Sequence, residues 1–191
     1  MRWLTLYARS RQVPASLAAL LISAPVVWAL SGIGGGGPWD PRASTLLLAA
    51  GATAVSVGLG GQDLALDRTA AIRWMPRRAA HVLLCGALIG GVLLAVRTLS
   101  GQPASTAFVL RNSAGLMGLV ALGAAWYGKQ YAWILPFAWM SVCFVAPSAP
   151  DAATQVLTWM LLPPDAAVGA WTALVLAVTG MTAYAVGGPR R

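Results

Sequence analysis

The sequence contains no glutamate and few charged side chains of any kind. Charged residues make up 9% of the 191 residues, whereas 58% are hydrophobic, and the mean hydropathy is +0.71. A soluble domain usually carries about 25% charged residues, because it needs a wetted surface. This shortage excludes an ordinary soluble fold and indicates that lipid surrounds most of the chain.

Residues that perform chemistry are equally scarce. The chain has one histidine, His81, and its five acidic residues are all aspartates in predicted loops. Its two cysteines, Cys85 and Cys143, lie inside apolar runs, where cysteine behaves as a small hydrophobe. No P-loop, no Gly-x-Ser-x-Gly and no metal-ligand spacing is present. We therefore predict no catalytic residue and no metal site; an undetected membrane enzyme, tested through His81, is one alternative.

The net charge of +8 does not indicate nucleic-acid binding. The arginines are spread along the chain, whereas a nucleic-acid interface gathers its basic residues in one patch. Basic residues that flank membrane helices explain the charge, so we expect no nucleic-acid partner.

The apolar segments are long and continuous. A helix that crosses a membrane needs about 20 apolar residues, and barrel strands would instead show about ten-residue alternation. The predicted spans are approximately residues 13–30, 43–59, 79–95, 112–127, 131–145 and 168–186. Residues 1–12 predict a short interfacial helix. The expected fold is all-α: a single transmembrane domain over residues 1–191, with about six transmembrane helices.

The distribution of basic residues predicts the orientation of this bundle. Cytoplasmic segments of membrane proteins are enriched in lysine and arginine. With the N-terminus in the cytoplasm, all 13 basic residues but Arg42, Arg97 and Arg111 fall on the cytoplasmic side. The pattern therefore predicts an even number of spans with both termini cytoplasmic.

Residues 61–78 form the most polar stretch. Asp63 is a plausible N-cap of a short amphipathic helix, and Pro76 is expected to end that helix. Such a helix across the cytoplasmic mouth can bind a soluble partner, although it can equally serve topology and headgroup contacts. The predicted partner-docking residues are Asp63, Asp67, Arg68, Arg73 and Trp74.

Residues 146–167 contain an apolar run that a wetted loop does not need. The run is too short to cross a membrane, and prolines flank it on both sides. It predicts an extracytoplasmic re-entrant hairpin that lines an exit path, with an interfacial plug as the alternative. The hairpin residues singled out are Val156, Trp159 and Met160.

Arg111 and Asn112 are the polar pair closest to a predicted span interior. If the fourth helix begins near Ser105, Arg111 lies several residues deep and needs a partner, for which Asp151 and Asp165 are candidates. Snorkelling to the outer interface is the more common behaviour of such an arginine, and it is our expectation here.

Two further patterns concern the predicted spans. Glycines in the third and fourth spans permit close helix contact, either within one chain or in a dimer. These glycines are Gly86, Gly90, Gly115, Gly118 and Gly123. No acidic residue falls in the middle of a span, which argues against proton- or sodium-coupled transport.

The order of these parts resembles the membrane subunit of an ABC-2-type ABC exporter. Residues 63–76 correspond by position to the helix that docks on a nucleotide-binding subunit, and residues 152–163 correspond to the re-entrant hairpin. The composition, with Asp67-Arg68-Thr69-Ala70-Ala71 and a Gly-Pro-Arg-Arg ending, resembles small membrane proteins of high-GC actinobacteria.

The resemblance implies a permease subunit in a bacterial cytoplasmic membrane that exports a hydrophobic or amphipathic substrate. It implies pairing with a second copy or a paralogous permease. This chain would hold no cofactor, because a separate cytosolic ATPase subunit would bind ATP. The main alternative is a non-transporting scaffold or accessory subunit of a larger membrane complex, and a secondary transporter is a further one.

Overall fold

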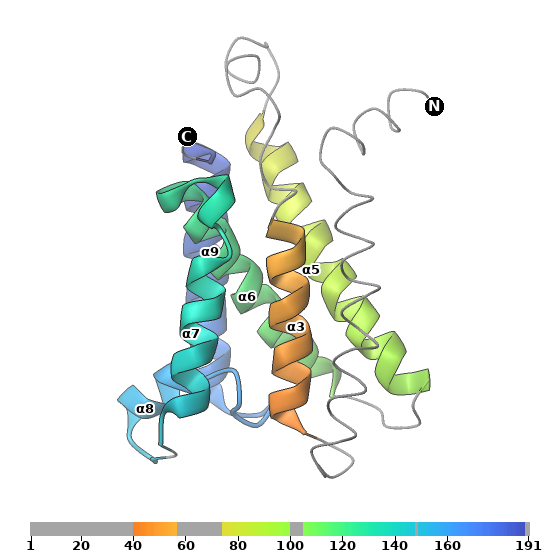
Figure 1. Cartoon of the computed structure of the whole chain (residues 1–191), viewed down its shortest axis with the longest axis vertical. Helices are drawn as coiled ribbons and strands as arrows, with labels where there is room; N and C mark the ends of the chain where they lie inside the picture. The colour runs from red at the N-terminus through yellow and green to blue at the C-terminus, as the bar shows by residue number, and fades with distance from the viewer. Residues whose placement is uncertain (1–39, 57–73, 100–104, 148, 190–191) are drawn as a thin grey trace.

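The computed structural model describes residues 40–56, 74–99, 105–147 and 149–189. Every regular element in these ranges is helical, so the all-α prediction is confirmed for them. The elements, shown in Figure 1, are α3 (Pro41–Ser56), α5 (Trp74–Leu99), α6 (Thr106–Tyr127), η2 (Lys129–Tyr131), α7 (Ile134–Val145), α8 (Ala152–Leu157) and α9 (Ala167–Gly187).

Three of these helices are long and apolar enough to cross a membrane. They are Met75–Leu99 of α5, all of α6 and all of α9. The 22 residues of α6 extend for about 33 Å at 1.5 Å per residue, against a hydrocarbon core of about 30 Å. The protein is therefore a helical membrane protein, with these three helices as its candidate spans in the described ranges.

The α6 helix forms the centre of the bundle. Of its most apolar 18-residue window, 78% is buried inside the protein, compared with 28% for α5 and 22% for α9. Helices α3, α5, α7 and α9 all pack against it. The outer helices instead expose large apolar side chains, among them Leu84 and Trp171. Because lipid is apolar, an outward hydrophobic face is stable there.

The predicted glycines lie within this one chain, at contacts between its helices. Gly86 and Gly90 of α5 face Met117 and Ser113 of α6. In α6, Gly118 faces the backbone of α9 at Leu176, and Gly123 faces Ala132. Small residues let helix backbones approach closely, which is the main source of packing energy when lipid replaces water. These glycines therefore serve intrachain packing.

Two predicted helix boundaries are wrong. The α6 helix begins at Thr106, six residues before the expected start, because the Ser105 hydroxyl caps it by accepting from the Phe108 amide at 3.4 Å. The α5 helix begins at Trp74 and continues through Pro76. Pro76 lies in the first turn, where a backbone N–H would have no intrahelical acceptor, so proline is tolerated there.

The predicted fifth span consists of two short pieces. Gly128, with φ of 93°, separates α6 from η2, and α7 begins only at Ile134. The 12 residues of α7 extend for about 18 Å, which is shorter than a membrane core of about 30 Å. By contrast, α9 matches its predicted boundaries to within one residue.

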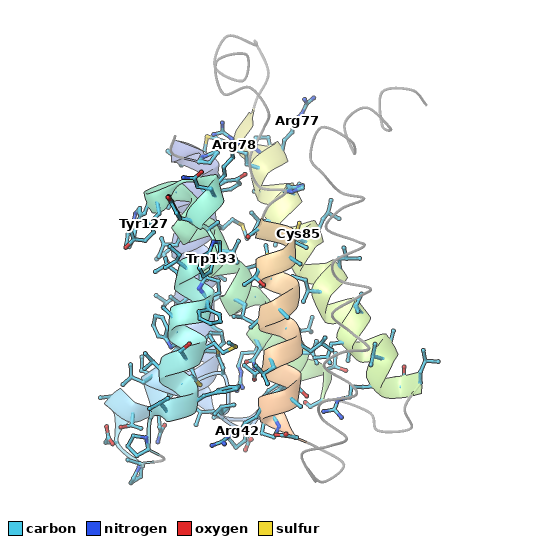
Figure 2. The ribbon with its side chains drawn as sticks, in the orientation of Figure 1. Arg42, Arg77, Arg78, Cys85, Tyr127 and Trp133 are labelled. Carbon is cyan, nitrogen blue, oxygen red and sulfur yellow. The ribbon has the colours of Figure 1, made fainter. Side chains whose placement is uncertain are left out.

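The bundle has two ends, which Figure 2 labels through their arginines. At the Arg42 end lie the start of α3, the end of α5 and the α7–α9 connection. At the Arg78 end lie the start of α5, the end of α6 and the end of α9. The first predicted span, the interfacial helix over 1–12 and most of the stretch 61–78 fall outside the described residues.

Candidate functional site

The structure brings four of the predicted site residues together at the Arg42 end. Arg111 and Asn112 lie in the second turn of α6, and they contact the chain around Trp159 and Met160, between α7 and α9. Trp74 is the first residue of α5. The other residues predicted to dock a partner lie outside the described residues, namely Asp63, Asp67, Arg68 and Arg73.

The α7–α9 connection begins with the short helix α8. Asp151 is its N-cap, and the carboxylate accepts a hydrogen bond from the Thr154 amide at 2.9 Å. This bond satisfies one of the amides that a helix start leaves free. Gln155 donates to the carbonyl of Pro150 at 2.9 Å, which closes the same turn. Val156, a predicted hairpin residue, is 38% exposed on α8.

After α8 the chain turns inward, so that Trp159 and Met160 are completely buried. The indole of Trp159 lies over Gly115 of α6, where a Cβ would be 2.9 Å from the ring atom Cζ3. Only glycine, which has no Cβ, leaves room for the indole at this position. Gly115 therefore makes room for Trp159, the largest fully buried side chain of the described residues.

The backbone carbonyl of Met160 accepts hydrogen bonds from two different helices. The Asn112 side-chain amide of α6 donates at 2.7 Å, and the Thr45 hydroxyl of α3 donates at 3.2 Å. Asn112 and Thr45 are both 0% exposed. These two bonds attach the connection to the second turns of α3 and α6.

Arg111 binds two further carbonyls of the connection. Its Nη2 donates to Leu162 at 2.7 Å and its Nη1 donates to Pro163 at 2.6 Å. Its Nε donates to the Asn112 side-chain oxygen at 3.1 Å, which orients the amide toward Met160. The Arg111 side chain is only 9% exposed. It does not snorkel to the surface, so that expectation is wrong.

The guanidinium has a site shaped by three further residues. Gly169 of α9 leaves room for it, since a Cβ there would lie 2.9 Å from Nη1. The Phe108 ring lies beneath it, 5.3 Å from the guanidinium carbon to the ring centroid. Asp165 acts on it electrostatically from a distance. Of the two aspartates considered as partners, neither forms a hydrogen bond with it, and backbone carbonyls take that role.

These contacts supply hydrogen-bond donors to backbone carbonyls of the connection. Residues 158–163 are not helical. The carbonyls of Thr158 and Pro163 accept from the Leu161 and Ala166 amides, but those of Met160 and Leu162 have no backbone donor in the described ranges. A backbone polar group buried without a hydrogen bond loses about 1–3 kcal/mol of stability, and lipid offers no replacement donor. Arg111, Asn112 and Thr45 supply the missing donors. We call these three residues the carbonyl clamp.

The α7 helix holds the connection from its other side. Trp139 donates from Nε1 to the Leu157 carbonyl at 3.1 Å. Cys143, one turn further along α7, is 1% exposed, and its thiol contacts the backbone of Met160 and Leu161. Cys143 is therefore buried beneath the same segment that the carbonyl clamp binds.

Sequence reasoning missed Thr45, Trp139 and Gly169 at this site. One signal was available, because Pro163 and Pro164 interrupt the helical pattern and so free the carbonyls that precede them. A buried arginine near such carbonyls is a natural donor. Nothing local in the α3 sequence marked Thr45, which reaches Met160 only through the packing of the bundle.

The side chains of the carbonyl clamp act as hydrogen-bond donors to backbone carbonyls. Within the four described ranges, no group of three His, Cys, Asp or Glu side chains could hold a metal ion. His81 lies on α5, where its Nε2 is 3.8 Å from the Cys85 sulfur. His81 belongs to the half of α5 that begins at the Arg78 end, so it is not part of the carbonyl clamp.

Comparison with known proteins finds no match to this chain among protein-family models, curated protein sequences or solved structures.

Proposed function

We propose that this chain is the permease subunit of an ATP-driven ABC exporter in a bacterial cytoplasmic membrane. In this proposal it has about six spans with both termini in the cytoplasm. Residues 146–167 form the extracytoplasmic re-entrant hairpin. A hydrophobic or amphipathic substrate passes beside that hairpin, between two permease subunits.

The observation that carries the proposal is the carbonyl clamp on a non-helical segment. Irregular backbone is tolerated at membrane depth only where protein buries it or where it lines a cavity. Here Arg111 and Asn112 of the central helix bind three carbonyls within four residues, those of Met160, Leu162 and Pro163. A buried ionisable residue in a membrane helix is a functional feature by default.

The source of energy follows from the acidic residues. The sequence has no glutamate. Its described aspartates are Asp40 before α3, Asp151 before α8 and Asp165 before α9. None of these three lies inside a long helix, where a coupling ion would need a carboxylate. ATP hydrolysis by a separate cytosolic subunit is therefore the proposed driving force.

The class of substrate follows from the surfaces of the bundle. The exposed faces of α5 and α9 are apolar, with Leu83 at 58% and Val175 at 56% exposure. Buried polar side chains of the described ranges are mostly engaged with backbone carbonyls, as in the carbonyl clamp. A pathway lined this way favours a hydrophobic drug, peptide or lipid over an ion.

The first test is a mild-detergent purification of the tagged chain from native membranes, followed by mass spectrometry. We expect a P-loop ATPase at stoichiometric amounts. The double variant Asp67→Arg with Arg68→Asp should lose that ATPase, because it reverses the charges of the predicted docking helix. Arg42→Asp is the matched control, since Arg42 lies at the opposite end of the bundle. Unchanged ATPase recovery with the double variant would refute docking through residues 61–78.

A scaffold or accessory subunit is the second candidate, favoured by the broad apolar faces of α5 and α9. Purification of the chain with membrane proteins only, and with no ATPase, would replace the exporter proposal with this one.

A further inference from the structure

A groove of about 250 Å³ lies between α5, α6 and α9. The one hydroxyl in its lining is that of Ser113, which donates to the carbonyl of Leu110 in its own helix. The groove therefore presents apolar walls and no polar side chain in need of a partner. Residues from all three helices contribute to it, including Val82, Ala87, Ala114, Ala177 and Met181.

The groove is small, and exposed apolar residues border it. Leu83 and Leu110, which border it, are 58% and 60% exposed. Its volume is below the range of about 300–1,000 Å³ that is typical of pockets for drug-sized ligands. A slender, flexible apolar group suits such a space better than a ring system does.

Two glycines lie where the helices around the groove approach most closely. Gly86 of α5 and Gly118 of α6 both line it. A Cβ at Gly86 would lie 3.3 Å from Cγ of Met117, so α5 and α6 approach closely at the floor. A Cβ at Gly118 would lie 2.6 Å from the Ala177 amide nitrogen, so α6 and α9 also approach closely beside the groove.

Arg78 lies about one helical turn beyond the end of the groove at Val82. Arg78, Val82 and Gly86 follow one another at intervals of four residues, so they form a single stripe on α5. Arg78 lies about 6 Å along the helix axis from Val82, the groove residue nearest the start of α5. On α9, Gly188 lies two turns beyond the groove residue Met181. A Cβ at Gly188 would be only 2.7 Å from Nη1 of Arg78.

The charges around this end favour an anion. Arg77, Arg78 and Lys129 lie at the Arg78 end. All described aspartates lie at the opposite end of the bundle, at the starts of α3, α8 and α9. Arg78 forms no hydrogen bond or ion pair with another residue of the described ranges. A guanidinium binds phosphate oxygens through two parallel hydrogen bonds, so Arg78 is suited to a phosphate group.

We propose that this groove binds one acyl chain of an anionic phospholipid, and that Arg78 holds the phosphate of the same lipid. The cation lies at the end of the bundle and the apolar groove lies further toward the middle. This order matches a phospholipid, whose phosphate lies at the membrane surface and whose chains extend inward. Basic pockets between membrane helices recognise lipid headgroups in this way. The site does not depend on an ATPase partner.

The test compares two lipids on the purified full-length chain by native mass spectrometry. Phosphatidylglycerol and phosphatidylcholine with identical acyl chains are added at equal concentration. We expect one retained phosphatidylglycerol per chain, with about fivefold higher affinity than phosphatidylcholine, because one basic residue near the surface contributes about that factor. Arg78→Gln should abolish the preference between the lipids. Ala114→Phe, which fills the groove, should lose both lipids.

Two control variants should behave like the wild type. Arg42→Gln removes an arginine at the other end, and Leu84→Phe enlarges an exposed α5 residue that does not line the groove. Circular dichroism checks folding, and Ala87→Phe replaces Ala114→Phe if the latter does not fold. Equal affinity for the two lipids, or an unchanged preference in Arg78→Gln, overturns the proposal. Displacement of the bound lipid by glycerol phosphate alone would indicate a free-phosphate site and also overturns it.

Discussion

Gly180 of α9 is in direct backbone contact with Gly118 of α6: a Cβ at Gly180 would lie 2.6 Å from the carbonyl carbon of Gly118. The contact brings α9 against the central helix along much of its length. Both the carbonyl clamp and the lipid groove depend on this approach. Gly169, which leaves room for Arg111, and Met181, which lines the groove, belong to the same helix α9.

Gly180→Ala should therefore destabilise the bundle. The added methyl group meets backbone rather than a movable side chain, so we expect a loss of about 1–3 kcal/mol in the free energy of unfolding. Gly91→Ala is the matched control, because no atom of the described residues lies within 4 Å of a Cβ at that position of α5. It should be neutral or stabilising by up to about 1 kcal/mol through helix propensity. Unfolding in mixed micelles, followed by circular dichroism, measures both. Equal stabilities would contradict the packing.

Arg111→Met should release the α7–α9 connection. The substitution keeps an apolar stem but removes the donor to the Leu162 carbonyl and one of the two donors to the Pro163 carbonyl, which also accepts from the Ala166 amide. At about 1.5–3 kcal/mol for hydrogen bonds from a charged group, the buried thiol of Cys143 should become about 10- to 100-fold more reactive toward a maleimide reagent. The measurement uses a Cys85→Ser background, so that Cys143 is the single thiol.

Arg42→Met provides the comparison for that experiment. Arg42 lies at the same end of the bundle as the carbonyl clamp, but its amide rather than its side chain is bonded, to the Asp40 carboxylate. Its labelling rate should not exceed that of the wild type, because the Arg42 side chain binds no carbonyl of the connection and its charge favours the Cys143 thiolate. A slow rate in Arg111→Met would mean that the arginine is not what holds the connection over Cys143.

Thr45→Val should weaken the attachment of α3 to the connection. Valine has nearly the shape of threonine but cannot donate to the Met160 carbonyl. Asn112 still donates to that oxygen, so the loss in unfolding free energy should be about 0.5–1.5 kcal/mol. Thr53→Val on the same helix is the control, since the Thr53 hydroxyl bonds only to Ala50 within α3. Losses of equal size in the two variants would argue against the interhelical bond.

The stability of α8 should depend on acid through Asp151. The hydrogen bonds from Thr154 lower the pKa of the Asp151 carboxyl below its usual value of 3.8. A group with a lowered folded-state pKa contributes its stabilisation above the unfolded-state pKa and loses it as the pH falls through the folded-state value. The cap should therefore be intact above about pH 5 and weaken in stronger acid.

Amide hydrogen exchange at Thr154 reports on this cap. Exchange, corrected for its intrinsic pH dependence, should accelerate below about pH 4 in the wild type. Asp151→Asn retains a good N-cap without a titrating group, so its corrected rate should not change with pH. Asp151→Ala should exchange fast at every pH. A pH-dependent Asp151→Asn variant would assign the effect to another group.

The α9 helix shows how far local sequence information reaches. Its apolar run and the flanking Pro164 and Gly188 fix both ends within one residue, because span length and helix-breaking residues act locally. Local reasoning was less successful at Pro76, because it treats proline as a helix end and ignores its tolerance in a first turn. At α6 it missed the Ser105 cap and began the helix too late.

The partners of Arg111 show where local information ends. An arginine close to a predicted helix start is equally compatible with snorkelling, with a salt bridge to Asp165 and with carbonyl binding. Arg111 binds the carbonyls of Leu162 and Pro163, which are more than 50 residues away in the chain. Only packing places them within reach.

The sequence by itself determined that this is an all-helical membrane protein, because a chain with 9% charged residues cannot form a wetted surface. Its glycines also indicated close helix packing. The tertiary structure decided that α6 is the central helix, that Arg111 binds backbone carbonyls, and that an apolar groove lies near Arg78. The physical reason is that each helix is apolar on nearly all sides. Hydrophobic periodicity then does not reveal which face is buried, and steric contact between small residues determines the arrangement.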